Sequence, residues 1–241
     1  MNKHLNFHRI NEYALLIEFE QSINPRINSQ VINLENAIIG KRIEGILETI
    51  PAYASLTVVF DPFKCSHDYI EKLLAKIIKS GNQVLDKPQS KLWKIPVCYD
   101  EEFGVDLKAL AYTHGYSMEE CIKFHSEVSY RVYMLGFMPG FLYLGGLDKR
   151  LITPRLSNPR TRIEEGSVAI GGDQTGIYAL ESPSGWNIIG KTPIKLFKAS
   201  EEKLSPVKAG DHLKFYAISR TEFSDIQQQF ESETLDWEDM S

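Results

Sequence analysis

The chain has 241 residues, of which 43% are hydrophobic and 24% are charged, and it carries a formal net charge of −5 with a pI near 5.7. This composition indicates a folded globular protein with enough apolar residues for one or two cores. The acidic balance argues against nucleic-acid binding, which needs a basic face. No apolar run is long enough to cross a bilayer, and the N-terminus lacks the apolar stretch of a signal peptide, so we expect a cytoplasmic protein that does not bind membranes.

Residues 1–88 predict a small α+β domain. β-Prone apolar runs alternate with amphipathic helical patterns, and the second helix has a 3-4-3-4 apolar stripe between a capping Ser66 and Gly81. The order strand, helix, strand, strand, helix matches a repeated split β-α-β motif, the ferredoxin-like arrangement, provided that one further strand follows. The predicted elements are strands at 12–20, 45–51 and 54–62 and helices at 28–42 and 66–80.

A polar, aperiodic stretch at 81–91 predicts a linker to a second domain, residues 89–241. This domain opens with an apolar β-prone run at 92–100 and two short helices at 106–113 and 117–126. Ser117 and Glu120 have the spacing of a capping box.

From Tyr130 onward the chain becomes rich in glycine, with short β-prone segments at close spacing. Such a pattern is typical of an antiparallel barrel or sandwich. We predict a last helix from Glu222 and a frayed acidic tail. The predicted strands are 130–135, 167–172, 176–180, 186–189, 194–197 and 212–218.

The cysteines and histidines form no known catalytic or metal-binding pattern. Cys65, Cys98 and Cys121 lie far apart without a C-x-x-C pair, which predicts buried free thiols. No metal-ligand spacing such as H-E-x-x-H is present, and no Ser-His-Asp arrangement can be read. We therefore expect no metal site in this chain.

Residues 185–192 read GWNIIGKT, which fits the phosphate-binding pattern G-x-x-x-x-G-K-[ST]. A phosphate loop lies between a strand and a helix and uses small residues, so that backbone N–H groups can converge on the anion. Here a proline-containing turn precedes the motif, and Trp186, Ile188 and Ile189 fill its variable positions. We therefore predict a strand and turn of the barrel rather than a nucleotide site.

A longer block carries a more specific signal. Residues 132–197, from VYMLGFMPGFLYLGG to NIIGKTPIKLF, resemble the signature block of the allophanate hydrolase subunit 1 family, and the likeness extends upstream through 95–125. It is looser at the N-terminus, where NEYALLIEFE and IPAYASLTVVFDP resemble the family's opening segments. Lys191 departs from the family, in which arginine is common, and lysine does not reproduce arginine's bidentate geometry.

The resemblance implies an N-terminal α+β domain followed by a mainly β, cyclophilin-like barrel domain. It implies a non-autonomous component of an ATP-dependent 5-oxoprolinase, which opens 5-oxoproline to glutamate together with the A and C subunits of that enzyme. The C subunit is related to allophanate hydrolase subunit 2. The resemblance leaves open which subunit binds ATP. The alternative that the resemblance allows is direct inhibition of a sensor histidine kinase by protein binding.

The candidate site residues come from four features within the signature block and the helix before it. Arginines that follow prolines suit a carboxylate, a glycine-rich turn permits close backbone approach, and aromatic residues among glycines can line a pocket. The alternatives are loop-to-barrel salt bridges, an ordinary hairpin and core packing, which we favour for Phe137 and slightly for Trp186. His125 is the candidate for a catalytic role, against a structural histidine on an apolar helix stripe. The predicted substrate-binding residues are Arg155, Arg160, Gly172, Gln174, Thr175, Tyr178, Phe141, Trp186 and Lys191.

Overall fold

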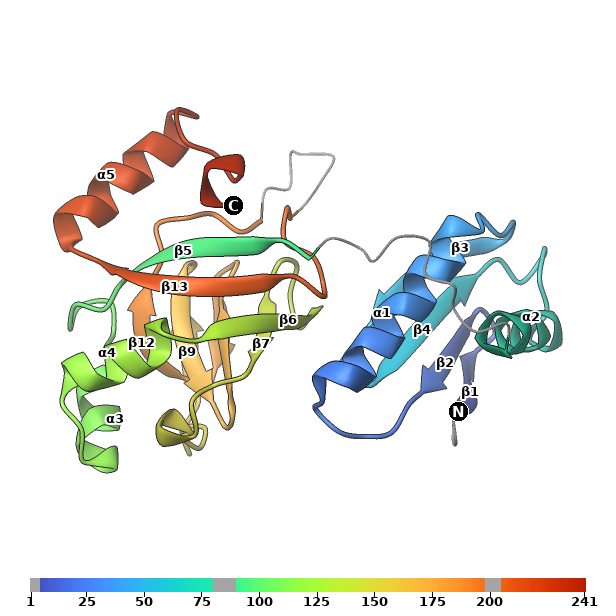
Figure 1. Cartoon of the computed structure of the whole chain (residues 1–241), viewed down its shortest axis with the longest axis horizontal. Helices are drawn as coiled ribbons and strands as arrows, with labels where there is room; N and C mark the ends of the chain where they lie inside the picture. Colours follow the sequence, from blue (N-terminus) through green and yellow to red (C-terminus); the bar gives the residue numbers. More distant parts are fainter. Residues whose placement is uncertain (1–4, 80–89, 198–204) are drawn as a thin grey trace. The chain divides into compact units, whose positions relative to one another are not determined.

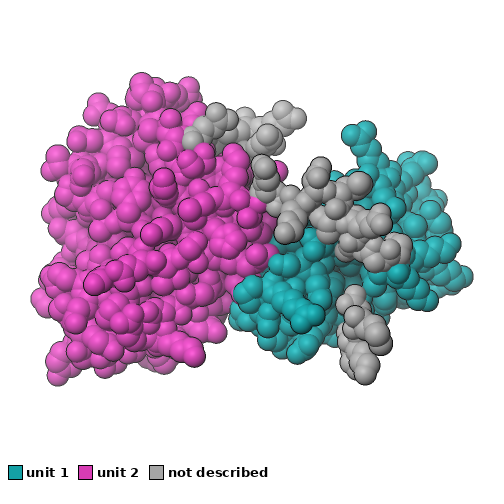
Figure 2. All heavy atoms as spheres, viewed as in Figure 1, with its two compact units in different colours: residues 1–89 teal, residues 90–241 magenta. Residues whose placement is uncertain are grey.

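The computed structural model describes residues 5–79, 90–197 and 205–241, and the chain divides into two compact units (Figures 1 and 2). Unit 1 is Met1–Gln89 and unit 2 is Ser90–Ser241. Each unit has its own hydrophobic core. The predicted linker at 81–91 lies mostly outside the described residues.

Unit 1 is a four-stranded antiparallel sheet with the strand order β1-β2-β4-β3, and two helices cover one face. Alternate residues of the central strands, such as Leu15 and Val58, are fully buried against the helices. The elements are β1 (Asn6–Asn11), β2 (Ala14–Glu18), α1 (Pro25–Gly40), β3 (Ile46–Pro51), β4 (Ser55–Phe60) and α2 (His67–Lys79).

The connectivity of unit 1 differs from the prediction. Its fourth strand is β1, which precedes β2 in the chain, rather than a strand that follows α2, so the ferredoxin-like connectivity is not confirmed. The sequence pattern did not reveal β1 because this edge strand is mostly solvent-exposed and lacks apolar alternation. Helix α1 also begins three residues earlier than predicted, since Asn24 caps it and Pro25 fits its first turn.

Unit 2 is built on a closed seven-stranded barrel with the order β10-β7-β6-β13-β5-β12-β9, as the predicted barrel class requires (Figure 1). Among these seven strands, β5 and β13 pair in parallel and the other neighbours pair antiparallel. The barrel strands are β5 (Leu92–Cys98), β6 (Ser129–Leu135), β7 (Leu142–Gly145), β9 (Ser167–Gly171), β10 (Gln174–Ile177), β12 (Asn187–Lys191) and β13 (His212–Ile218).

Strand alternation gives the barrel two apolar surfaces. Leu144 and Ile177 point into the main core, whereas Tyr143 and Gly176 lie on the outside of the same strands. A smaller apolar cluster covers this outer surface next to the two-stranded sheet of β8 (Arg160–Ile163) and β11 (Ser182–Ser184). Unit 2 therefore buries residues on both sides of β7, β9 and β10.

Two short helices follow β5, as predicted: α3 (Leu107–His114) and α4 (Met118–Ser126). The capping box of Ser117 and Glu120 is confirmed. All three cysteines are free and buried, which is also confirmed.

Three predictions for unit 2 are wrong. Residues 194–197 are not a strand, although Ile194 and Leu196 are buried. The acidic tail is not frayed: after α5 (Arg220–Glu231) and the short helix η2 (Glu238–Met240), Met240 is buried and the Trp237 ring packs edge-on against Trp93 at 5.4 Å. Phe137 does not fill the core; it is 64% exposed and has a φ of 68°.

Candidate functional site

Four aromatic side chains form a compact group on the outer surface of the barrel. Phe141 precedes β7, Tyr143 lies on β7, Tyr178 follows β10 and Trp186 precedes β12. The ring centroid of Phe141 lies 4.7 Å from that of Tyr143, 4.9 Å from that of Tyr178 and 5.7 Å from that of Trp186, each in an edge-on geometry. We call these four residues the aromatic platform.

Two glycines beneath the platform make this packing possible. A Cβ atom on Gly171 would lie 2.5 Å from the Trp186 ring, and one on Gly176 would lie 2.9 Å from the Phe141 ring. Neither distance is compatible with a side chain, so these glycines serve aromatic packing. Gly172 differs, because its φ of 68° requires a glycine-like turn and a Cβ atom there would meet nothing within 4 Å.

Arg155 places a positive charge over the platform. Its guanidinium carbon lies 5.8 Å from the centroid of the Trp186 ring, and the side chain is solvent-exposed. Burial raises the pKa of the Tyr143 hydroxyl, and the charge of Arg155 partly offsets that shift. Within the described parts of the chain, no carboxylate forms an ion pair with Arg155. The guanidinium is thus free to bind an anionic ligand.

The Tyr178 hydroxyl is held inside the platform rather than offered to a ligand. It donates a hydrogen bond of 2.5 Å to Ser184 Oγ, which also accepts the backbone N–H of Trp186 at 3.3 Å. Burial raises the pKa of Tyr178 to about 12, so the phenol stays protonated at neutral pH.

Arg160 is engaged within unit 2. Its Nη1 and Nη2 donate to the two carboxylate oxygens of Asp106 at 2.9 and 2.6 Å, and the same carboxylate accepts the backbone N–H of Ile188 at 2.7 Å. This bidentate pair ties the start of β8 to α3 and β12, which favours the structural alternative for Arg160 over substrate binding. Asp106 did not stand out in the sequence, because its partner lies 54 residues away.

His125 and Thr175 lie inside the barrel, and both are fully buried. The imidazole stacks on Phe215 with centroids 4.6 Å apart, and both ring nitrogens have hydrogen-bond partners within the core. Burial lowers the pKa of His125 to about 3, so the ring is neutral at physiological pH. Since no substrate reaches a sealed core, this placement favours a structural rather than a catalytic histidine.

Gln174 and Gly172 belong to the turn region between β9 and β10. Gln174 lies on the outside of the barrel at the start of β10 and is 9% exposed. The backbone N–H of Gly172 donates to the carbonyl of Thr153 at 2.8 Å, and Thr153 N–H donates in return to Gly172 at 3.2 Å. This bridge brings the segment that carries Arg155 next to the glycine-rich turn.

Lys191 lies at the other end of β12 from Trp186. Its Nζ is 2.5 Å from Glu164, and both side chains line a pocket of about 290 Å³ between the barrel and α5. The strand Asn187–Lys191 pairs with β9 and β5, and residues 192–197, which follow it, contain no helix, so the GWNIIGKT motif lacks the structure of a phosphate loop. Lys191 and Arg155 therefore do not share one site.

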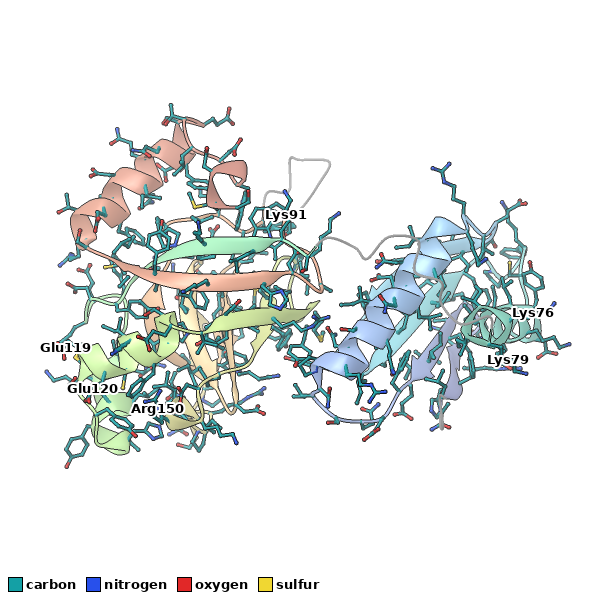
Figure 3. All side chains as sticks on the ribbon, viewed as in Figure 1. Lys76, Lys79, Lys91, Glu119, Glu120 and Arg150 are labelled. Atoms are coloured by element: carbon teal, nitrogen blue, oxygen red, sulfur yellow. The ribbon has the colours of Figure 1, made fainter. Side chains whose placement is uncertain are left out.

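Other charged side chains lie on helix surfaces, such as Lys76 and Lys79 on α2 and Glu119 and Glu120 on α4 (Figure 3). Across residues 5–79, 90–197 and 205–241, no three His, Cys, Asp or Glu side chains are grouped closely enough to hold a metal ion. No helix in those ranges is long and apolar enough to span a membrane.

Comparison with known proteins gives consistent results. The family model described as "Carboxyltransferase domain, subdomain C and D" matches residues 5–207. The chain is 38% identical over 229 residues to the B subunit of 5-oxoprolinase from Bacillus subtilis (strain 168), covering 89% of this chain and 93% of that protein. It is 42% identical over 175 residues to the corresponding 5-oxoprolinase protein of Haemophilus influenzae, covering 71% and 79%.

A solved structure, that of TTHA0988, superposes with a TM-score of 0.76 at 32% sequence identity. The match covers 86% of this chain but only 40% of TTHA0988. The chain is thus similar to less than half of that longer polypeptide.

Proposed function

Since the chain belongs to the family of the carboxyltransferase domain, subdomains C and D, also called the allophanate hydrolase subunit 1 family, we propose that it is the B subunit of an ATP-dependent 5-oxoprolinase. The observation that carries this proposal is the 38% identity to the B subunit of the Bacillus subtilis enzyme over nearly the full length of both chains. The alternative, an inhibitor of a sensor histidine kinase, is not favoured by the relatives' names.

The reaction explains why such an enzyme uses ATP. Opening the five-membered lactam of 5-oxoproline requires water to add to the carbonyl carbon and the ring C–N bond to break, which yields glutamate. An amide carbonyl is a poor electrophile, and phosphorylation of its oxygen at the expense of ATP supplies a good leaving group. We assign ATP use to the assembled complex and leave open which of its chains binds ATP.

In this proposal Arg155 binds the carboxylate of 5-oxoproline. Its guanidinium is exposed above Trp186 and has no ion pair in the described residues, whereas Arg160 is already paired with Asp106. The bridge between Thr153 and Gly172 brings the turn that contains Gln174 next to Arg155, and the aromatic platform would hold Arg155 in place. Placing the lactam is the contribution that these residues can make to catalysis.

We further propose that the chain acts in the cytoplasm with the A and C subunits of 5-oxoprolinase. The structural match with TTHA0988 supports an assembly, since more than half of that polypeptide has no counterpart in this chain. The two compact units would be separate domains of the one polypeptide.

The test is to purify this chain alone and with both partner proteins, and to measure ADP release that depends on 5-oxoproline. We expect activity from the complete complex and none from the lone chain. Full activity of the lone chain, or an inactive complete complex, would contradict the proposal.

The Arg155 site can be tested in the same assay. Arg155→Ala removes a charge-assisted contact that is worth about 1.5–3 kcal/mol, so we expect KM for 5-oxoproline to rise roughly ten- to a hundredfold. Arg162→Ala is the matched control, because Arg162 pairs with exposed Glu181 on the surface and should leave KM unchanged. With 2-pyrrolidinone, which lacks the carboxylate, Arg155→Ala and wild type should behave alike; a difference there would argue against carboxylate binding.

A further inference from the structure

A chain of hydrogen bonds crosses the barrel interior through His125. The Tyr99 hydroxyl lies 2.7 Å from Nδ1, and Nε2 lies 3.0 Å from Thr175 Oγ1. The Thr175 hydroxyl lies 3.0 Å from the carbonyl oxygen of Ala169. These hydrogen bonds thus join the end of β5 to α4, β10 and β9.

The direction of the donors follows from the acceptors. The carbonyl of Ala169 can only accept, so the Thr175 hydroxyl donates to it and must accept from His125 Nε2–H. His125 Nδ1 is then unprotonated and accepts the Tyr99 hydroxyl. Each of these three hydrogen bonds then has one donor and one acceptor, so His125 is fixed as the neutral Nε2–H tautomer.

Thr175 connects this interior network to the outer surface. Its neighbour Gly176 faces outward, pairs with Tyr143 across the strands, and lies directly under the rings of Phe141 and Trp186. A Cβ atom at Gly176 would come within 2.9 Å of Phe141, so β10 and the platform rings are packed tightly against each other. A displacement of β10 must therefore move the platform.

We infer that His125 is a positioning residue: through Thr175 it holds β10 at a fixed depth, and this sets the position of the aromatic platform and of Arg155 above it. The kinetic part of this inference rests on the proposed function. The hydrogen-bond and packing parts do not, and they can be measured on the lone chain.

The tautomer is tested by ¹⁵N NMR of the histidine side chains, with the His125 signals identified by their loss in His125→Gln. We expect a single neutral ring, protonated at Nε2, that does not titrate between pH 8 and pH 5. A ring protonated at Nδ1, or a cationic ring, would overturn the inference.

The coupling to the platform is tested by Thr175→Val, which keeps the shape and removes the hydroxyl, against Thr175→Ser, which keeps the hydroxyl. In Thr175→Val the indole N–H signal of Trp186 should shift, while those of Trp93 and Trp237, which lie outside the platform, should stay in place. Thr175→Ser should restore the wild-type Trp186 signal. An unmoved Trp186, or equal movement of all three tryptophans, would refute the coupling.

In the assembled complex, Thr175→Val should raise KM for 5-oxoproline roughly tenfold, with kcat within about twofold of wild type. The reason is that Arg155, which binds the substrate carboxylate, is displaced but still present. Thr175→Ser should match wild type. If Thr175→Val does not fold, Tyr99→Phe weakens the other end of the network and should raise KM in the same direction. An active complex whose KM is unchanged by the folded variant would overturn the inference, whereas an inactive wild-type complex would refute the proposed function instead.

Discussion

Each unit of this protein buries a titratable side chain without an ion-pair partner in the described residues, and the two units do so with opposite chemistry. In unit 2, His125 is fully buried and has hydrogen bonds at both ring nitrogens. In unit 1, Glu35 on α1 is partly buried and accepts one hydrogen bond, from Thr49 of β3 at 3.1 Å. Burial lowers the pKa of His125 to about 3 and raises the pKa of Glu35 to about 7.

Burial of a neutral base and burial of a neutral acid give opposite dependences of stability on pH. The folded state of unit 2 is most stable while the His125 ring is neutral in both the folded and the unfolded state. As the pH falls, the ring is protonated in the unfolded state first, and the contribution of His125 to stability is lost. The folded state of unit 1 is most stable while the Glu35 carboxyl is protonated in both the folded and the unfolded state. As the pH rises, the carboxyl ionises in the unfolded state first, and the contribution of Glu35 to stability is lost. Acid should therefore weaken unit 2, and alkali should weaken unit 1.

The largest expected effect concerns His125. Its contribution is fully present above pH 6.5, the ordinary pKa of histidine, and falls as the pH drops toward about 3. At the acid limit this amounts to about 4–5 kcal/mol of unfolding free energy. Denaturant titrations followed by tryptophan fluorescence report on unit 2, because all three tryptophans lie there.

The matched variant is His125→Gln, which retains a donor near Thr175 but has no titration in this range. At pH 7 we expect wild type to be the more stable protein, and the gap should narrow steadily from pH 6.5 to pH 3. A difference in stability that stays constant over that range would show that His125 does not make unit 2 sensitive to acid.

The second effect concerns Glu35. Its contribution is fully present below pH 4.5 and is lost as the pH rises through about 7, which amounts to about 3 kcal/mol. Glu35→Gln should therefore stabilise unit 1 by about that amount at pH 8 and have no effect near pH 4. Hydrogen exchange of peptides from α1 and β3 reports on this unit. Glu44→Gln, whose side chain is 87% exposed, is the control for the loss of one surface carboxylate from unit 1.

The smallest effects come from the hydrogen-bond partners. Tyr99→Phe leaves His125 Nδ1 without a donor in a sealed core and should destabilise unit 2 by about 1–3 kcal/mol. Thr49→Val should cost unit 1 less than about 1 kcal/mol, because water can replace the lost donor at partly exposed Glu35. Equal losses of unfolding free energy in Tyr99→Phe and Thr49→Val would show that burial does not control how much these hydrogen bonds contribute to stability.

The sequence predicted those features that depend on nearby residues. The capping box at Ser117, the apolar stripe of α4 that includes Cys121, and the strand at 212–218 all follow from spacings of two to four residues. The same local reasoning correctly assigned GWNIIGKT to a strand, because bulky residues fill the positions that a phosphate loop needs small.

The candidate site could be predicted only in part. Phe141, Tyr178, Trp186 and Arg155 were found because they lie in one recognisable block, and the structure brings them together on the outer surface of the barrel. Arg160 has the same sequence context as Arg155, and only the fold shows that Asp106 occupies it. Phe137 was misplaced because glycines on both sides of an aromatic are compatible with a core plug and with an exposed loop alike.

By itself, then, the sequence determined the α+β and barrel classes, the capping box at Ser117, the burial of the cysteines and the family resemblance, because each depends on local periodicity or on a continuous motif. Only the tertiary structure decided that β1 completes the first sheet, that His125 points into a buried core and that Arg160 pairs with Asp106. These outcomes depend on which residues from distant parts of the chain meet, and spacing along the chain does not contain that information.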